Sequence, residues 1–349
     1  MEVGMSKILI TGGAGFVGYN LAVHLKNKGH AVMVMDNLVR RGSEINVPKF
    51  HEQGIGFTHG DIRNKEDFNN HPALRSIEYD VILETAAQPS ACSGYRNPIF
   101  DITNNYLGLL NVLEYARQSK SKVIFWSTNK VYDADYVNLN PLIEKETRWE
   151  EECEGEGISE AYQIDGGNHS IYGLSKVCAD LTCQEWSKAF NMDIIVNRFS
   201  CLAGQNQWGM SEQGWISWFC IAAILGLPVT LYGWKGKQVR DILFVPDLCK
   251  LIDIEIESKE TGVFNIGGSK FCNASLLECI VLIEKLTGKR IRWDYEDKAR
   301  TADHCFYITN IQKARSLLKW EPIIGLKQGV QEIIDWVIIN EKLLRRMYA

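Results

Sequence analysis

A glycine-rich turn between an apolar run and an amphipathic stretch constrains the fold of this chain more than any other feature. Residues 7–11 predict a buried strand, and Thr11-Gly12-Gly13-Ala14-Gly15-Phe16-Val17-Gly18 then opens a helix that continues over residues 19–28. Gly12 permits the tight turn, Gly15 lets the backbone approach a pyrophosphate, and Gly18 allows close helix–strand packing. The first N–H groups of such a helix have no partner within it, so they can bind a phosphate.

The rest of the first half repeats the alternation of strand and helix. Short apolar runs recur, and amphipathic stretches such as residues 105–119 lie between them; the runs cover residues 31–36, 80–87, 122–128 and 192–199. Continuous apolar strands of this kind are typical of a parallel sheet buried on both faces. The pattern predicts an α/β fold, a Rossmann-type doubly wound parallel sheet.

The composition of the sequence changes after about residue 200. Gly, Gln and Trp crowd residues 204–219, and strand-like runs follow at 240–245 and 262–268. A chain of 349 residues is long enough for two coupled domains. We expect residues 1–200, with 241–268 returning to them, to form the nucleotide-binding domain. Residues 201–240 and 269–349 should then form a smaller, discontinuous substrate-binding region.

Composition excludes several classes of function. The formal net charge is −5 and no basic block stands out, so nucleic acid is not the expected main partner. No apolar run reaches the roughly 18 residues of a membrane span, and the first residues do not resemble a signal peptide. The ten cysteines are scattered without a CxxC pair and the seven histidines lack ligand spacing, which disfavours a metal site. We therefore expect a cytoplasmic protein with reduced cysteines.

An acidic residue after the second predicted strand indicates which dinucleotide the turn binds. Asp36 ends that strand, 18 residues beyond Gly18 and close to the expected ~20. Its carboxylate can accept hydrogen bonds from both ribose hydroxyls of an adenosine and would repel a 2′-phosphate, which favours NAD over NADP. Arg40 and Arg41 leave the alternative open, because nearby arginines can accommodate that phosphate.

A phenol and an ammonium four residues apart provide a candidate catalytic pair. Tyr172 and Lys176 would lie on one face of a helix, where the ammonium is expected to lower the pKa of the phenol. Ser127 and Thr128 end a buried strand upstream, and the Thr128 hydroxyl can orient a substrate alcohol. These groups suit removal of a proton from a hydroxyl while a nicotinamide takes the carbon-bound hydride.

Together these motifs resemble the extended short-chain dehydrogenase/reductase family, whose members modify nucleotide sugars. The resemblance covers nearly the whole chain, and within the family it is greatest to the enzymes that invert carbon 2 of CDP-activated deoxyhexoses. The segments that carry the closer likeness are HGDIRNK (59–65), STNKVY (127–132), QGWISWFC (213–220) and GKQVRD (236–241). The resemblance implies bound NAD, a nucleotide-activated sugar as substrate, and a homodimer or homotetramer.

The resemblance also implies roles for individual residues. Thr128, Tyr172 and Lys176 would be catalytic. The cofactor would be held by Gly12, Gly15, Phe16, Val17, Gly18, Asp36, Asn37, Arg40, Asp61, Ile62, Ala86, Ala87, Gln88, Asn105, Ser127, Tyr172, Lys176 and Ser200. The substrate would be held by Gln88, Asn129, Lys130, Gln213, Arg240 and Arg300, with Arg240 on the phosphates, and no residue would bind a metal.

Two departures bear on the reaction and the substrate. Asn129-Lys130 stands where the family's dehydratases carry an Asp-Glu pair, which argues against elimination of water. Asp303-His304-Cys305 stands where the 2-epimerases read Asp-Gln-Arg, so a second phosphate contact is missing; His304 either replaces some of that charge or is an ordinary surface histidine.

Three further alternatives stay open at the level of sequence. A 4-epimerase would use the same groups on another carbon of the sugar. A non-catalytic NAD-binding regulator would share the fold but would not need Thr128, Tyr172 and Lys176. The acidic stretch over residues 144–156 is interpreted as a solvated surface insertion, with a cation site as the alternative.

Overall fold

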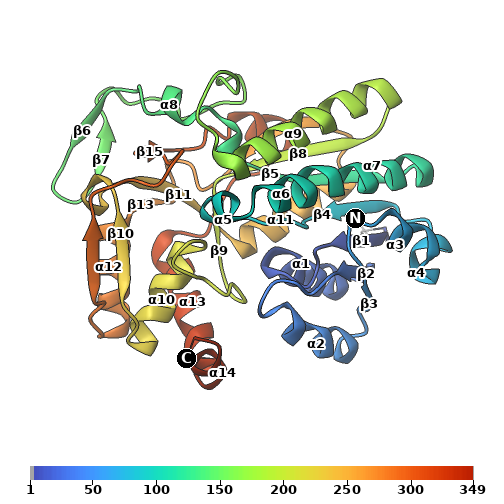
Figure 1. Cartoon of the computed structure of the whole chain (residues 1–349), viewed down its shortest axis with the longest axis horizontal. Helices are drawn as coiled ribbons and strands as arrows, with labels where there is room; N and C mark the ends of the chain where they lie inside the picture. The colour runs from blue at the N-terminus through green and yellow to red at the C-terminus, as the bar shows by residue number, and fades with distance from the viewer. Residues whose placement is uncertain (1–3, 349) are drawn as a thin grey trace.

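A seven-stranded parallel sheet forms the centre of the computed structural model, which describes residues 4–348 (Figure 1). The order of its strands is β12-β8-β5-β4-β1-β2-β3. Their bounds are β1 (Lys7–Thr11), β2 (Ala31–Asp36), β3 (Gly56–His59), β4 (Val81–Glu84), β5 (Lys122–Thr128), β8 (Ile194–Phe199) and β12 (Gly262–Ile266). The predicted Rossmann-type sheet is therefore confirmed, and the apolar runs that predicted it coincide with β1, β2, β4, β5 and β8.

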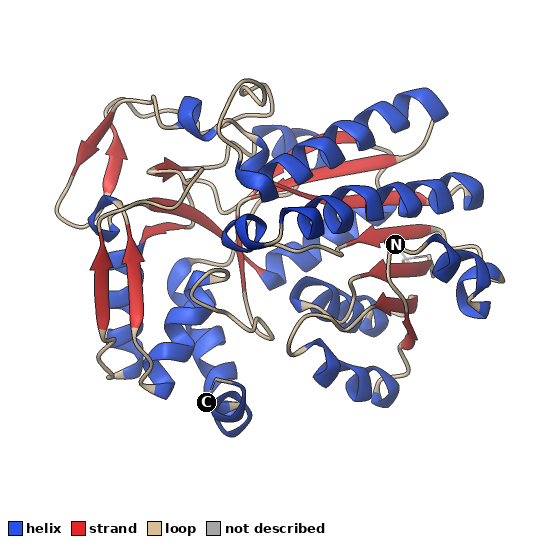
Figure 2. Ribbon diagram, in the orientation of Figure 1, coloured by secondary structure: helices blue, strands red, loops and turns tan. Residues whose placement is uncertain are grey.

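The sheet is buried on both faces, as its continuous apolar strands require. Ile8 and Ile10 of β1 pack toward one core, which also contains Leu21, whereas Leu9 between them packs toward another, which contains Leu113. Helices α1 (Phe16–Asn27) and α11 (Val245–Glu257) cover the first face. Helices α7 (Gly108–Ser119) and α9 (Ser170–Phe190) cover the second. Figure 2 shows this layering of strands between helices.

Shorter helices lie between these elements along the chain, and one strand of the seven-stranded sheet was not foreseen. The short helices are α2 (Asn46–Glu52), α3 (Lys65–Asn70), α4 (Pro72–Arg75), α5 (Ala91–Arg96), α6 (Pro98–Ile102) and α8 (Ala134–Val137). Strand β3 escaped prediction because only one of its four residues is buried, so its sequence GFTH carries little apolar signal.

The remaining strands and helices form a second, smaller region (Figure 1). Around β11 (Val239–Phe244) lie β9 (Cys201–Ala203), β13 (Asn273–Ser275) and β15 (Phe306–Tyr307). Strands β10 (Val229–Tyr232) and β14 (Trp293–Glu296) pair in parallel. The helices here are α10 (Trp215–Leu225), α12 (Leu276–Thr287), α13 (Leu326–Ile339) and α14 (Glu341–Met347).

The two regions are interleaved along the chain. Strand β11 belongs to the smaller region, whereas β12, which follows it after α11, forms the edge of the seven-stranded sheet beside β8. A return of the chain to the large sheet thus occurs within residues 241–268. The domain boundaries at 200, 240 and 268 stay predictions.

The acidic stretch contains a small hairpin that docks on the smaller region. Strands β6 (Leu142–Glu144) and β7 (Trp149–Glu151) pair in antiparallel fashion. The Glu144 carboxylate accepts from the Nζ atoms of Lys235 and Lys237 at 3.0 and 2.8 Å. Part of the stretch is thus neutralised by lysines rather than simply solvated.

Two features are absent from residues 4–348. No group of three or more His, Cys, Asp or Glu side chains there could hold a metal ion. No helix in that range has the length and apolar character needed to cross a bilayer.

Candidate active site

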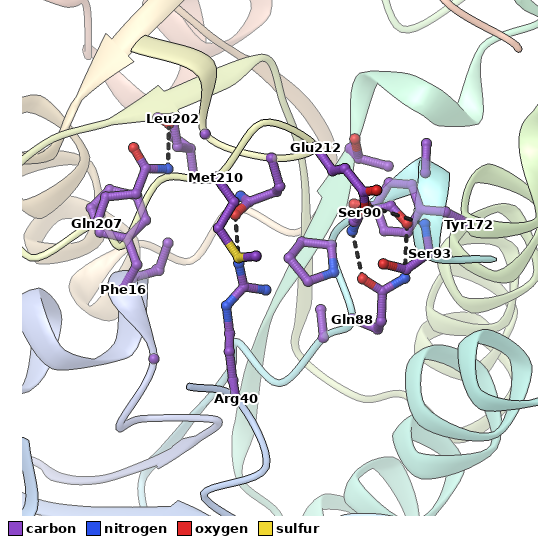
Figure 3. Close-up of a pocket in the computed structure, with 18 of the residues that line it drawn as sticks. Phe16, Arg40, Gln88, Ser90, Ser93, Tyr172, Leu202, Gln207, Met210 and Glu212 are labelled. Atoms are coloured by element: carbon purple, nitrogen blue, oxygen red, sulfur yellow. Dashed lines mark hydrogen bonds between the residues drawn. The ribbon is translucent and has the colours of Figure 1, made fainter. Parts of the chain in front are cut away.

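One cavity of about 760 Å³ lies at the carboxyl ends of the parallel strands, between the large sheet and the smaller region (Figure 3). It brings together all but two of the predicted site residues. Those that line it are Gly12, Gly15, Phe16, Val17, Gly18, Asp36, Asn37, Arg40, Ile62, Ala86, Ala87, Gln88, Ser127, Thr128, Asn129, Lys130, Tyr172, Lys176, Ser200, Gln213, Arg240 and Arg300. Asp61 and Asn105 do not line it.

The glycine-rich turn presents the start of α1 to this cavity. Gly15 precedes the first residue of α1, and no side chain caps the helix there. Gly12 has a φ of +64°, and a Cβ atom on it would lie 2.4 Å from the Cα of Ala86. A Cβ on Gly18 would lie 2.3 Å from the Cα of Gly13. Only glycine fits these two positions, and the uncapped N–H groups suit the pyrophosphate of NAD.

Asp36 lies beside this turn at the end of β2. Its carboxylate accepts from the backbone N–H of Ala14 at 3.0 Å and of Leu38 at 2.8 Å. Burial raises the pKa of Asp36, and these two N–H groups act against that rise. The carboxylate is thus fixed where the ribose of a dinucleotide is expected to lie.

Arg40 and Gln213 meet across the cavity. The Nη2 atom of Arg40 donates to Oε1 of Gln213 at 2.5 Å. Figure 3 shows Arg40 extending toward Met210, with Gln88 and Tyr172 to one side of it and Phe16 and Gln207 to the other. Gln213, predicted to contact substrate, therefore lies against a predicted cofactor residue.

The two predicted residues outside the cavity support others that line it. The side chain of Asn105 accepts from the backbone N–H of Gln88 at 2.8 Å and donates to Ser175 Oγ at 3.0 Å. It thereby ties the loop after β4 to α9. Asp61 accepts from Asn37 at 2.9 Å; burial opposes ionisation, but hydrogen bonds from Arg63 and Asn37 lower the pKa of Asp61 to about 2.

The predicted catalytic residues meet at one end of the cavity. Burial raises the pKa of Tyr172 to about 12, and a hydrogen bond with the Thr128 hydroxyl acts against that rise. Lys176 is fully buried, with Nζ 4.4 Å from the centre of the Phe125 ring. The pKa of Tyr172 therefore lies above the ordinary value of a phenol, and the predicted lowering is not found.

The side chain of Ser127, the residue before Thr128, is hydrogen-bonded to a residue of α9. Its hydroxyl donates to Asp180 Oδ2 at 2.5 Å, and Asp180 also pairs with Arg198 at 2.8 Å. The hydroxyl is therefore held by a buried ion pair, although Ser127 lines the cavity. Ser200, which follows the neighbouring strand β8, is also buried at the cavity wall.

A buried carboxyl group, that of Glu84, lies near Lys176, the lysine predicted to be catalytic. Glu84 ends β4 in register with Thr11 of β1 and Phe125 of β5, and its Oε1 atom has no hydrogen-bond partner among residues 4–348. Burial raises the pKa of Glu84 to about 7, although the charge of Lys176 acts against that rise. Sequence reasoning gave this residue no role, since it sits inside an apolar strand.

The opposite wall of the cavity is cationic. Lys130, Arg240 and Arg300 all line it, and the Arg300 guanidinium lies 4.6 Å from the centre of the Tyr232 ring. Asp303 also lines it and binds both Lys130 and Arg240. No local pattern pointed to Asp303, because its partners lie 173 and 63 residues away in the chain.

His304 lies next to this wall, and neither sequence interpretation of it holds. The side chain is fully buried rather than at the surface. Burial, together with the charges of Lys130 and Arg240, holds the pKa of His304 well below its usual range. The ring is therefore neutral and replaces none of the missing arginine's charge.

Comparison with known proteins assigns the chain to a family. The model of the NAD dependent epimerase/dehydratase family matches residues 8–267. The chain belongs to this family. It is 36% identical over 342 residues to the CDP-paratose 2-epimerase of Salmonella typhi, covering 95% of this chain and 98% of that protein.

Two further proteins are similar to this chain over most of its length. A putative UDP-glucose 4-epimerase of Methanocaldococcus jannaschii is 29% identical, covering 96% of this chain and 99% of its own. The structure of a UDP-glucose 4-epimerase of Thermus thermophilus in complex with NAD has a TM-score of 0.79 and 26% identity, covering 95% of this chain and 98% of that chain. The protein is an NAD-dependent enzyme of the nucleotide-sugar epimerase/dehydratase family, and the glycine turn with Asp36 is the part of the cavity that fits NAD.

Proposed function

We propose that this enzyme inverts carbon 2 of a CDP-activated deoxyhexose, a reaction of the CDP-paratose/CDP-tyvelose type. The observation that carries the proposal is the pair Asn129-Lys130, which follows Thr128 and lines the cavity. These residues leave the reacting end without the carboxylate pair that elimination of water needs. The 36% identity to a CDP-paratose 2-epimerase supports the same reaction.

The residues at the reacting end have the chemistry for transient oxidation. Tyr172 takes the proton from the hydroxyl on carbon 2, and Thr128 orients that hydroxyl. When bound, NAD supplies the hydride acceptor and, after the sugar has turned over, the hydride donor. Lys176, which lines the same cavity, would hold the nicotinamide ribose and would supply positive charge beside the phenol. The flat 2-keto sugar then presents its other face, and Tyr172 returns the proton.

A 4-epimerase is the second candidate function. A putative UDP-glucose 4-epimerase is 29% identical over almost the whole chain, and the same three residues would act on carbon 4. The two candidates differ in which carbon is held beside Tyr172. That choice depends on how the cationic wall seats the sugar nucleotide.

The first test is incubation with a panel of nucleotide sugars, beginning with CDP-activated deoxyhexoses and CDP-glucose. Substrate deuterated at carbon 2 should then yield an epimer that retains its deuterium, because the hydrogen returns from within a closed site. Mass spectrometry and NMR of the product measure the label and its position. Loss of the label to solvent would contradict oxidation at carbon 2, and inversion at carbon 4 alone would establish the second candidate.

Three accompanying predictions remain. The substrate partner is a nucleotide-activated sugar, the assembly is a homodimer or homotetramer, and the protein acts in the cytoplasm. Size-exclusion chromatography with light scattering measures the assembly, and the nucleotide-sugar panel identifies the substrate.

A further inference from the structure

Three charged side chains from distant segments meet at the cationic wall. Lys130 Nζ donates to Asp303 Oδ1 at 3.0 Å, and Arg240 Nη2 donates to the same oxygen at 2.7 Å. The backbone N–H of His304 donates to this oxygen as well, at 3.0 Å. One carboxylate oxygen therefore fixes the separation of the ammonium from the guanidinium, and all three side chains line the cavity.

The backbone around Asp303 adds a second restraint on Lys130. The Ala302 carbonyl accepts from Lys130 Nζ at 2.9 Å. Ala302 has a φ of +53°, a left-handed conformation that costs free energy for a residue other than glycine. Two of the three ammonium donors are thus occupied by the 302–303 turn, and the third remains for a ligand.

The charges of this cluster do not cancel. Lys130 and Arg240 carry two positive charges against the one negative charge of Asp303, whose pKa burial would raise but Lys130 and Arg240 hold well below its usual range. His304 is neutral, and Cys305 is buried. With Arg300 on the same wall, the excess is two positive charges, which matches the two negative charges of a diphosphate diester.

Lys130 also connects this cluster to the reacting end. Its backbone N–H donates to the Thr128 hydroxyl at 3.3 Å, while its ammonium reaches Asp303. A diphosphate held at the ammonium would therefore place the attached sugar at Thr128 and Tyr172.

We propose that Lys130 is the second cation that binds the diphosphate of the nucleotide sugar, and that Asp303 is the positioning residue that holds it beside Arg240. The inference rests on the proposed function in one respect, the nucleotide-sugar substrate. It deepens that function by assigning the phosphate site to a lysine from the large-sheet region and a carboxylate from the smaller one.

The test is calorimetric titration of the NAD-loaded protein with CDP, UDP and cytidine. Lys130→Met should weaken binding of the preferred diphosphate by tenfold or more, because a charge-assisted hydrogen bond is lost, and should change cytidine binding less than twofold. Lys130→Arg should recover part of the loss. Lys237→Met is the matched control: Lys237 is 16% exposed against 18% for Lys130, pairs with Glu144 at 2.8 Å, and does not line the cavity.

A double-mutant cycle tests the role of Asp303. Asp303→Asn should weaken diphosphate binding, and in that background Lys130→Met should cost much less than it does alone. Tighter binding by Asp303→Asn, or additive effects of the two changes, would overturn the positioning role. Circular dichroism and unchanged NAD affinity show that each variant is folded.

The outcomes separate this inference from the proposed function. Binding of a diphosphate that Lys130→Met leaves unchanged would overturn the inference and leave the proposed function standing. Binding of neither CDP nor UDP, with no turnover of any nucleotide sugar, would overturn both.

Discussion

The cavity has a glycine-rich side and a cationic side, and each is built differently for binding an anion. The glycine-rich side, formed by Gly12, Gly15, Gly18 and Asp36, offers the backbone N–H groups of one helix from within 25 consecutive residues. The cationic side, formed by Lys130, Arg240, Arg300 and Asp303, uses side chains from three separate segments held by ion pairs. The first anion site depends on local backbone geometry, whereas the second depends on the two regions being correctly docked.

The difference extends to the response of each side to pH. Behind the glycine-rich side, Glu84 has a pKa raised to about 7, because burial penalises its charge. On the cationic side, the charges of Lys130 and Arg240 hold the pKa of Asp303 well below its usual range. Folding is therefore opposed by ionisation of Glu84 and favoured by ionisation of Asp303.

The largest expected effect is on turnover, from a substitution that leaves both the glycine-rich side and the cationic side of the cavity unchanged. Tyr172→Phe deletes only the phenolic oxygen, so turnover should fall by about 10²–10⁴-fold. Binding of NAD and of the nucleotide sugar should persist, as measured by calorimetry. Activity within twofold of the unmodified enzyme would mean that another group takes the proton.

The next largest effect is a loss of NAD affinity, from a substitution on the glycine-rich side alone. Asp36→Ala removes an acceptor for the ribose hydroxyls and should weaken NAD binding by about 1.5–3 kcal/mol, with poorer discrimination against NADP. Asp36→Asn is the intermediate case: the N–H groups of Ala14 and Leu38 donate to different carboxylate oxygens, so the single amide oxygen of Asn can keep only one of these two hydrogen bonds. Diphosphate binding should be unaffected, and an equal loss there would break the distinction between the two sides.

A pH-dependent effect on stability follows from Glu84. Its folded-state pKa of about 7 lies above the ordinary 4.5, so its contribution to stability is lost as the pH rises through this interval. Glu84→Gln should therefore raise the free energy of unfolding by about 2 kcal/mol at pH 8.5 relative to the unmodified protein. At pH 4.5 or below Glu84 is protonated in the folded protein, so the variant should gain no free energy of unfolding there. Chemical denaturation at both pH values measures it, and an equal gain at both would contradict burial of the charge.

The smallest effect concerns the contact between the regions. Gln213→Ala removes the acceptor for Arg40 and should weaken NAD binding by about 0.5–1.5 kcal/mol. Gln213→Glu should preserve the contact, since a carboxylate also accepts from the guanidinium. If nucleotide-sugar binding weakened instead, Gln213 would be a substrate residue, as its place in the sequence first suggested.

The same comparison explains what the sequence could predict. Strand β1, the glycine turn and Asp36 follow one another closely, so their spacing alone indicates the dinucleotide site. The side chains of Tyr172 and Lys176 share a helix face for an equally local reason. These features depend on backbone geometry that neighbouring residues determine.

Lys130, Arg240 and Arg300 of the cationic side were predicted, but the ion pairs that hold the first two were not, for the opposite reason. Nothing near Asp303 in the sequence indicates that it binds Lys130, and nothing near His304 indicates that its ring is buried. Arg40 and Gln213, 173 residues apart, also meet only through packing of the two regions. The pKa of Tyr172 was misjudged because spacing does not reveal burial, which raises this pKa more than the hydrogen bond with Thr128 lowers it.

The interleaving of β11 and β12 has a consequence for synthesis of the chain. The ribosome releases β8 long before its edge partner β12, and the residues made in between include β9, α10, β10 and β11 of the smaller region as well as α11, which covers the large sheet. Until residue 266 has emerged, β8 presents an unpaired edge of apolar residues, the kind of surface that promotes association between nascent chains. Neither region can therefore complete its folding as an independent N-terminal or C-terminal half, and a cut at residue 200 would leave that edge permanently exposed.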